Sequence, residues 1–150
     1  MKITPLESGQ WQRVDRATAD VFTGAAVSLF TIATGRVLVK LILGEVTTVI
    51  QTQANATKLT FDPTDTGAST DLCATLDITA DAVGRIYTIS GTVGDALRDA
   101  LQYGSGGLTA LPLILKPGSI LLDCAASNTG SVKWTIWYVP LEDGATITAA

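Results

Sequence analysis

Ser131-Val132-Lys133-Trp134-Thr135-Ile136-Trp137-Tyr138-Val139 is the stretch that decides the fold class. Its β-branched and aromatic residues favour a strand, and Pro140 ends the run. Because side chains alternate along a strand, one face carries Val132, Trp134, Ile136 and Tyr138, and the other carries Lys133, Thr135, Trp137 and Val139. Both faces carry large side chains. We therefore expect this strand either to be central in its sheet or to meet another subunit with its second face.

The sequence on either side repeats the pattern of short β-branched runs separated by turn signals. Lys116-Pro117-Gly118-Ser119 has proline and glycine where a type II turn needs them, and Ser127-Asn128-Thr129-Gly130 predicts another turn. From Val21 onward we expect about eight to ten strands, with a turn signal roughly every 8–12 residues. This spacing predicts a mostly β protein, with a single antiparallel β-sandwich or jelly-roll-like domain over residues 21–150.

Two segments depart from this pattern. The run from Asp95 to Tyr103 starts with a helix N-cap residue, has Leu97, Ala100 and Leu101 on one helical face, and is followed by Gly104. It predicts one short helix over about 95–103. Residues 1–20 are polar and show neither helical nor strand periodicity, which predicts an extended N-terminal arm.

The composition argues against several classes of function. The chain has 150 residues, 47% of them hydrophobic and 16% charged, a net charge of −4 and no histidine. Without histidine the usual Ser-His and Cys-His catalytic arrangements cannot form, and we expect no enzyme, metal or cofactor. The ten basic residues are scattered, which predicts no nucleic-acid partner.

The apolar segments and the two cysteines give limited information on where the protein is located. The longest apolar run, residues 37–43, is interrupted by Lys40 and is too short to cross a bilayer, so we expect no membrane partner. Residues 1–7 lack the apolar core of a signal peptide, which predicts a soluble protein made in the cytoplasm. Cys73 and Cys124 could form one disulfide or remain as two thiols.

Three groups of residues allow alternative interpretations that involve chemistry or ligand binding. Asp65-Thr66-Gly67-Ala68 resembles the active-site motif of retropepsin-like aspartic proteases, which would imply a dimer, although Asp62-Pro63-Thr64-Asp65 reads better as a turn. Asp62, Asp65 and Asp71 could line a calcium loop, but the spacing of an EF-hand is not met. Trp134, Trp137 and Tyr138 could stack on a sugar, but alternation places Trp137 on the face opposite to the other two.

The same sequence offers candidate interface residues. Tryptophan and arginine are enriched at binding hot spots, and Trp11 stands among polar residues in the predicted arm. We expect an interface formed by Trp11, Arg13, Arg16, Lys133 and Trp137. A tail whose tryptophan packs on its own domain is the alternative.

Residues 21–150 resemble the small structural proteins of tailed bacteriophages, in particular capsid decoration (cement) proteins. The resemblance rests on Lys116-Pro117-Gly118-Ser119-Ile120, Gly130-Ser131-Val132-Lys133-Trp134 and Val139-Pro140-Leu141-Glu142-Asp143-Gly144-Ala145. It implies a β-rich protein without catalysis that binds the major capsid protein on the outer surface of the virion. It also implies a homo-oligomer, with a trimer favoured. A tail or baseplate adhesin that binds host glycan is the alternative function, and a dimeric aspartic protease using Asp65 is a remote one.

Overall fold

A computed structural model describes residues 11–17, 22–100 and 112–150, and this part of the chain is built of β-strands without a helix. The strands are β1 (Gln12–Arg16), β2 (Phe22–Thr23), β3 (Val27–Ala33), β4 (Val37–Thr48), β5 (Ala56–Pro63), β6 (Thr70–Asp71), β7 (Leu76–Asp77), β8 (Ile86–Thr88), β9 (Arg98–Ala100), β10 (Leu113–Leu115), β11 (Gly118–Cys124), β12 (Ser127–Asn128), β13 (Ser131–Pro140) and β14 (Thr146–Ala149).

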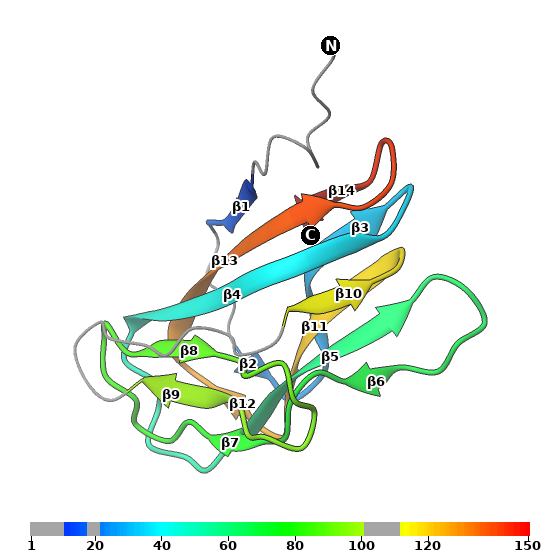
Figure 1. Cartoon of the computed structure of the whole chain (residues 1–150). Helices are drawn as coiled ribbons and strands as arrows, with labels where there is room; N and C mark the ends of the chain where they lie inside the picture. The colour runs from blue at the N-terminus through cyan, green and yellow to red at the C-terminus, as the bar shows by residue number, and fades with distance from the viewer. Residues whose placement is uncertain (1–10, 18–21, 101–111) are drawn as a thin grey trace.

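The strands form two main antiparallel sheets, which confirms the predicted mostly β sandwich (Figure 1). The first sheet, called here the β13 sheet, has the order β1-β13-β4-β8-β9, and β10 also pairs with β4. The second, called here the β11 sheet, has the order β14-β3-β11-β5-β6, and β7 also pairs with β5. A short pair of β2 and β12 completes the described strands. The described strands are more numerous than the eight to ten that the sequence predicts, and several of them have only two or three residues.

The core lies between the two sheets and is formed by inward-facing aliphatic and aromatic side chains. Its largest fully buried members are Trp134, Tyr87, Tyr138, Phe30, Leu29, Ile32, Ile42, Ile50, Leu59, Ile78 and Ile89. Many of them follow from the alternation seen in the sequence, because β4 and β11 bury roughly every second side chain against the opposite sheet.

β13 lies between β1 and β4, so the expectation that this strand is central in its sheet is confirmed. Its inner face is closely packed at Trp134, which is paired with Gly44 of β4. A Cβ atom at residue 44 would lie 2.8 Å from the indole ring, so glycine is what lets the ring lie against the β4 backbone. The ring also stacks on Tyr87, with ring centroids 6.4 Å apart.

The helix predicted over 95–103 is wrong in its described part. Arg98–Ala100 forms β9, which pairs with Ile86–Thr88, and Ala96 forms a bridge with Ala74. Residues 101–103 lie outside the described part. Two helical turns have little stability of their own, and here pairing with β8 provides backbone hydrogen bonds that a short helix would make only locally. Within the described residues no helix is long and apolar enough to cross a membrane.

The predicted N-terminal arm contains a strand of the domain's own sheet. Gln12–Arg16 forms β1 and pairs with β13 from Tyr138 to Trp134, while residues 1–10 and 18–21 lie outside the described part. The sequence gives no strand signal here because β1 is polar and lies at the edge of the sheet. Arg16, one of the predicted interface residues, is only 8% exposed, and its Nε donates a hydrogen bond to the Ala150 carbonyl at 3.3 Å.

Two predicted turns have different outcomes. The chain does turn before β13, where Gly130 has a φ of 118°. The Lys116–Ser119 segment also turns, but Gly118 is not among the residues with positive φ, so the type II assignment is wrong. Glycine is needed there for another reason: a Cβ at residue 118 would collide with the carbonyl oxygen of Asp62 and with the ring of Phe61.

A buried polar cluster fastens the loop before β8 to the sheet. The Asp81 side chain is buried, its Oδ1 lies 2.9 Å from Nη1 of Arg85, and its Oδ2 accepts a hydrogen bond from the Tyr87 hydroxyl. The backbone carbonyl of Asp81 accepts a further hydrogen bond from the Ile50 amide at 3.0 Å. The cluster therefore ties three segments together around one buried carboxylate.

Tyr138 links the first described strand to the last. Its buried hydroxyl donates to Oε1 of Gln12 in β1 at 2.6 Å and accepts from the Ile147 amide in β14 at 3.1 Å. The two bonds connect the edges of both sheets through one side chain.

Of the two states that the sequence allows for the cysteines, the structure has the free thiols. Cys73 and Cys124 are both buried and do not form a disulfide, and burial raises the pKa of Cys124 to about 11.

Candidate interaction surface

The outward side of β1, β13 and β4 carries most of the predicted interface residues. We call it the outer face of β13, and it consists of Arg13, Asp15, Leu41, Leu43, Glu45, Thr47, Ser131, Lys133, Thr135 and Trp137. Cross-strand neighbours share one side of a sheet, so the register that pairs Trp137 with both Arg13 and Leu41 places these three side chains together.

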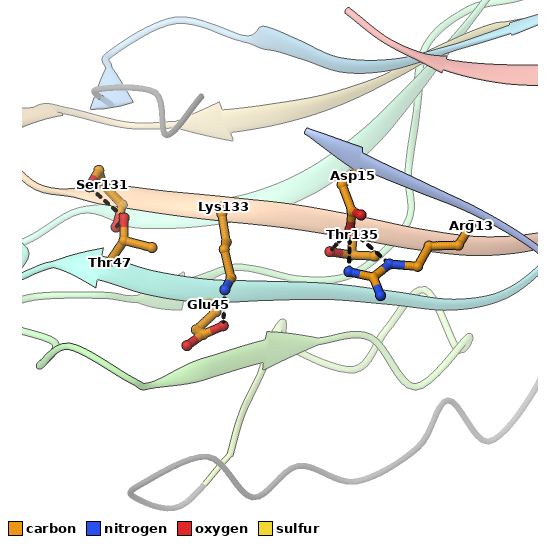
Figure 2. A network of polar contacts seen from close by, with 7 residues as sticks. All are labelled: Arg13, Asp15, Glu45, Thr47, Ser131, Lys133 and Thr135. Carbon is orange, nitrogen blue, oxygen red and sulfur yellow. Dashed lines mark hydrogen bonds and ion pairs between the residues drawn. The ribbon is translucent and has the colours of Figure 1, made fainter. Parts of the chain in front are cut away.

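One end of the outer face is held by a carboxylate that bridges two strands. Oδ1 of Asp15 accepts hydrogen bonds from Thr135 at 2.8 Å and from Nε and Nη2 of Arg13 at 3.0 and 2.9 Å (Figure 2). The hydrogen bond from Thr135, followed by that from Arg13, lowers the pKa of Asp15 below its ordinary value of 3.8. The carboxylate is therefore ionised at neutral pH, and it fixes the direction of the Arg13 guanidinium.

Further along β13, two more polar pairs cross to β4. Nζ of Lys133 lies 2.7 Å from Oε2 of Glu45, and the hydroxyls of Thr47 and Ser131 lie 2.7 Å apart (Figure 2). The ion pairs on this face are exposed to solvent, where such pairs contribute about 0–1 kcal/mol to stability. These side chains can therefore exchange partners without a large loss of stability.

Aromatic and aliphatic side chains accompany the polar pairs. The guanidinium of Arg13 lies 5.6 Å from the centre of the Trp137 ring, and Leu41 and Leu43 are half-buried beside it. Trp11 is 53% exposed, and Nζ of Lys40 lies over its ring, 4.9 Å from the ring centre. Large apolar side chains with guanidinium groups above them are typical of binding surfaces.

The outer face brings together only part of the predicted interface set. Arg13 and Trp137 are in contact, Lys133 lies on the same side of β13, and Trp11 lies beside Lys40 of the neighbouring β4. The predicted interface set lacks seven residues of this face, although alternation already predicts that Thr135 shares a face with Lys133 and Trp137: Asp15, Leu41, Leu43, Glu45, Thr47, Ser131 and Thr135. The place of those on β1 and β4 depends on which strands are neighbours, and the alternation within one strand carries no such information.

The structure gives no support to the sugar platform. Trp134 and Tyr138 lie in the core with their rings between the sheets, as expected for the inner face of β13. Trp137 is on the opposite side, next to Arg13. The three aromatic side chains therefore cannot present one surface to a ligand.

The acidic loop after β5 behaves as a turn with separate ion pairs. Asp65 accepts a hydrogen bond from the Gly67 amide and pairs with Lys116 at 2.6 Å, and this lysine chiefly lowers its pKa. A protease dyad needs the opposite, a carboxyl that holds a proton. Asp62 accepts from Ser69, and Asp71 pairs with Lys58, so the three carboxylates turn to different partners. No group of three metal-binding side chains occurs among the described residues.

Replacing Thr135 with valine is expected to raise the pKa of Asp15 toward its ordinary value of 3.8, because the hydroxyl is the largest cause of the lowered pKa. A depressed carboxylate pKa contributes stability above the unfolded-state value that is lost as the pH falls through the folded-state value. The window therefore lies below pH 3.8 for Asp15. Carbon NMR titration of the carboxylate measures the change; Thr47→Val, on the same face, is the control that leaves Asp15 unchanged.

Comparisons with known proteins add no assignment. No protein-family model matches the chain, and searches of curated proteins and of solved structures find no match either.

Proposed function

We propose that this chain is a structural virion protein that decorates the outer capsid of a tailed bacteriophage and stabilises it by bridging neighbouring capsomers. Its partner is the major capsid protein, and the chain acts as a homo-oligomer, with a trimer favoured. The proposal starts from the sequence resemblance, and the outer face of β13 is the observation that supports it best.

The outer face suits binding to another protein rather than stabilisation of its own domain. Trp137, Leu41 and Leu43 offer apolar contacts, while Arg13 and Lys133 sit in exposed ion pairs that contribute little to folding. Truncation of a hot-spot tryptophan or arginine typically costs about 2 kcal/mol or more of binding free energy. A rigid sheet also loses little conformational entropy when it binds.

In this proposal the gain in capsid stability comes from many copies of the protein bound at once. Each copy buries a modest area across a seam between capsomers, and an oligomer engages several sites at once. Separating two capsomers then requires breaking all of these contacts together. Modest affinity at each site is therefore compatible with a large gain in capsid stability.

The decisive experiment measures co-sedimentation of the chain with undecorated capsids made of the major capsid protein of the same phage. Trp137→Ala is expected to fold and to weaken decoration by roughly thirtyfold, the equivalent of about 2 kcal/mol. Val83→Ala, on an exposed valine of the loop before β8 that is not part of the outer face of β13, is the matched control and should decorate like the wild type. Wild-type protein that does not sediment with capsids would refute the proposal.

Light scattering tests the oligomer, and a truncation tests the arm. A trimer mass supports the proposed symmetry, whereas a dimer contradicts it.

The truncation should stop at residue 10, because residues 12–16 form β1 and their removal would expose the edge of β13. Loss of decoration by this shortened chain with an unchanged fold would support an arm that contacts a neighbour; full decoration would refute that role.

A further inference from the structure

An apolar groove lies on the side of the sandwich away from β1. It has a volume of about 370 Å³ and opens between β10, the end of β5 and the loop that leads to β6. Its apolar lining consists of Phe61, Pro63, Ala68, Ile114 and Leu115. Ile114 is 63% exposed at the lip, the largest exposure among the large hydrophobic side chains in the described part of the chain.

The groove runs beside an unpaired strand edge. β10 pairs with β4 along one edge, and none of the described strands pairs with its other edge (Figure 1). The residues that line the groove opposite β10 come from β5, the following loop and β6 of the other sheet. An open edge offers backbone amides and carbonyls to an added strand, and an apolar groove next to it accepts alternate side chains of that strand.

Two cations stand at the same end of this edge. Val37 of β4 pairs with Leu115 of β10, so Arg36 and Lys116 are adjacent to the last pair of the ladder. Both line the groove, Arg36 with Glu142 at 2.5 Å and Lys116 with Asp65 at 2.6 Å. These ion pairs are exposed and contribute about 0–1 kcal/mol each, so the two cations can accept a further carboxylate.

We infer that this groove is a docking site for an extended acidic segment of a partner protein. The segment adds to β10 as a strand, places an apolar side chain among Phe61, Pro63 and Leu115, and brings a carboxylate to Arg36 and Lys116. The open edge favours a peptide over a free small acid, because only a peptide can use the backbone groups of β10. The inference is independent of the proposed function, since the groove and the outer face of β13 share no residue.

A displayed library of random heptapeptides, selected on the full chain, identifies the probe. Sequences with an aliphatic or aromatic residue close to Asp or Glu should be enriched, and one of them is synthesised with a fluorescent label. In anisotropy titrations Ile114→Asp and Ala68→Phe should each weaken binding at least about tenfold, because one puts charge in the groove and the other fills it. Val83→Asp is the matched control for Ile114→Asp, since Val83 is also an exposed β-branched apolar residue, at 55%, and does not line the groove.

Charge is tested by a second matched pair. Lys116→Glu should weaken binding of the peptide, and changing the peptide's acid to Gln should remove most of that difference. Lys133→Glu changes an equally exposed, ion-paired lysine on another face and should leave the peptide affinity unchanged. Near-ultraviolet circular dichroism confirms that each variant is folded.

Three results would overturn the inference. The first is a selection in which acidic and apolar sequences are not enriched. The second is equal peptide binding by Ile114→Asp and wild type. The third is a small aromatic acid such as benzoate that competes with the peptide and binds with the same affinity. Capsid co-sedimentation separates this question from the proposed function. Wild-type protein that binds the selected peptide but not capsids refutes only the proposed function, and wild-type protein that decorates capsids but selects no acidic and apolar peptide refutes only the inference. Ile114→Asp should decorate like the wild type, because the groove and the outer face of β13 share no residue.

Discussion

Asp81→Ala is expected to lower the free energy of unfolding by about 1–3 kcal/mol, the usual cost of leaving a buried hydrogen-bonding group without its partner. Asp81 is 5% exposed, forms an ion pair with Arg85, and accepts a hydrogen bond from the buried Tyr87 hydroxyl. Without the carboxylate, the buried tyrosine hydroxyl loses its acceptor in a place where water cannot readily replace it, and the partly exposed guanidinium of Arg85 loses its ion-pair partner. Urea denaturation followed by tryptophan fluorescence measures the change.

Asp15 supplies a matched control for this experiment. Its carboxylate also accepts from one arginine and one hydroxyl, Arg13 and Thr135, but it is exposed on the outer face of β13. Asp15→Ala should therefore change stability far less than Asp81→Ala. Asp81→Asn, which keeps the shape and one acceptor oxygen, should fall between them. Equal losses for Asp81→Ala and Asp15→Ala would show that burial does not determine the strength of the Asp81 cluster.

Trp134→Ala is expected to destabilise the domain by about 3–5 kcal/mol, the range for deleting a large aromatic side chain from a core. The ring lies against Gly44 and stacks on Tyr87, and glycine has no side chain with which to fill the space that the ring leaves. The cavity therefore cannot collapse easily, which favours the upper part of the range. Urea denaturation followed by far-ultraviolet circular dichroism avoids the loss of a fluorescent group.

Trp137→Ala is the control on the same strand. Trp137 lies three residues further along β13 and on the opposite side of the sheet, where it is half-buried next to Arg13. It should lose about 1 kcal/mol, as most changes near a surface do. The contrast separates packing from proposed binding, because Trp137→Ala should weaken decoration while Trp134→Ala weakens folding. A comparable loss of stability in both variants would contradict the two-sided interpretation of β13.

The sequence predicts the long β-branched strands and their faces, but not their partners and not the polar or short strands β1 and β9. Alternation over Ser131–Val139 correctly separates the buried Trp134 from the half-buried Trp137, since it depends only on neighbouring residues. The region 95–103 was misread because Asp95 and Leu97 satisfy a helix pattern locally, whereas pairing of Arg98–Ala100 with β8 depends on the whole fold. β1 escaped detection for the same reason, as its polar residues become a strand only against β13.

In the candidate surface, too, some features follow from residue type and alternation, and others depend on the whole fold. Arg13, Lys133 and Trp137 could be chosen from residue type and alternation, and the register then brings them to one face. Arg16 was chosen by type as well, but the alternation of β1 turns it inward, toward Ala150. The groove beside β10 could not be foreseen at all, because its lining comes from segments distant in sequence that only the stacking of two sheets brings together.

The pairing of β1 with β13 has a consequence for the time course of folding. Asp15 and Thr135, which meet between β1 and β13, are 120 residues apart in the chain. A ribosome adding about 5–20 residues per second needs on the order of ten seconds to deliver β13 after β1. During that interval the polar strand β1 has no partner, and Trp134 is not yet present to cover Gly44. The polar sequence of β1 keeps the waiting segment soluble, and the sandwich closes only after β13 has left the ribosome.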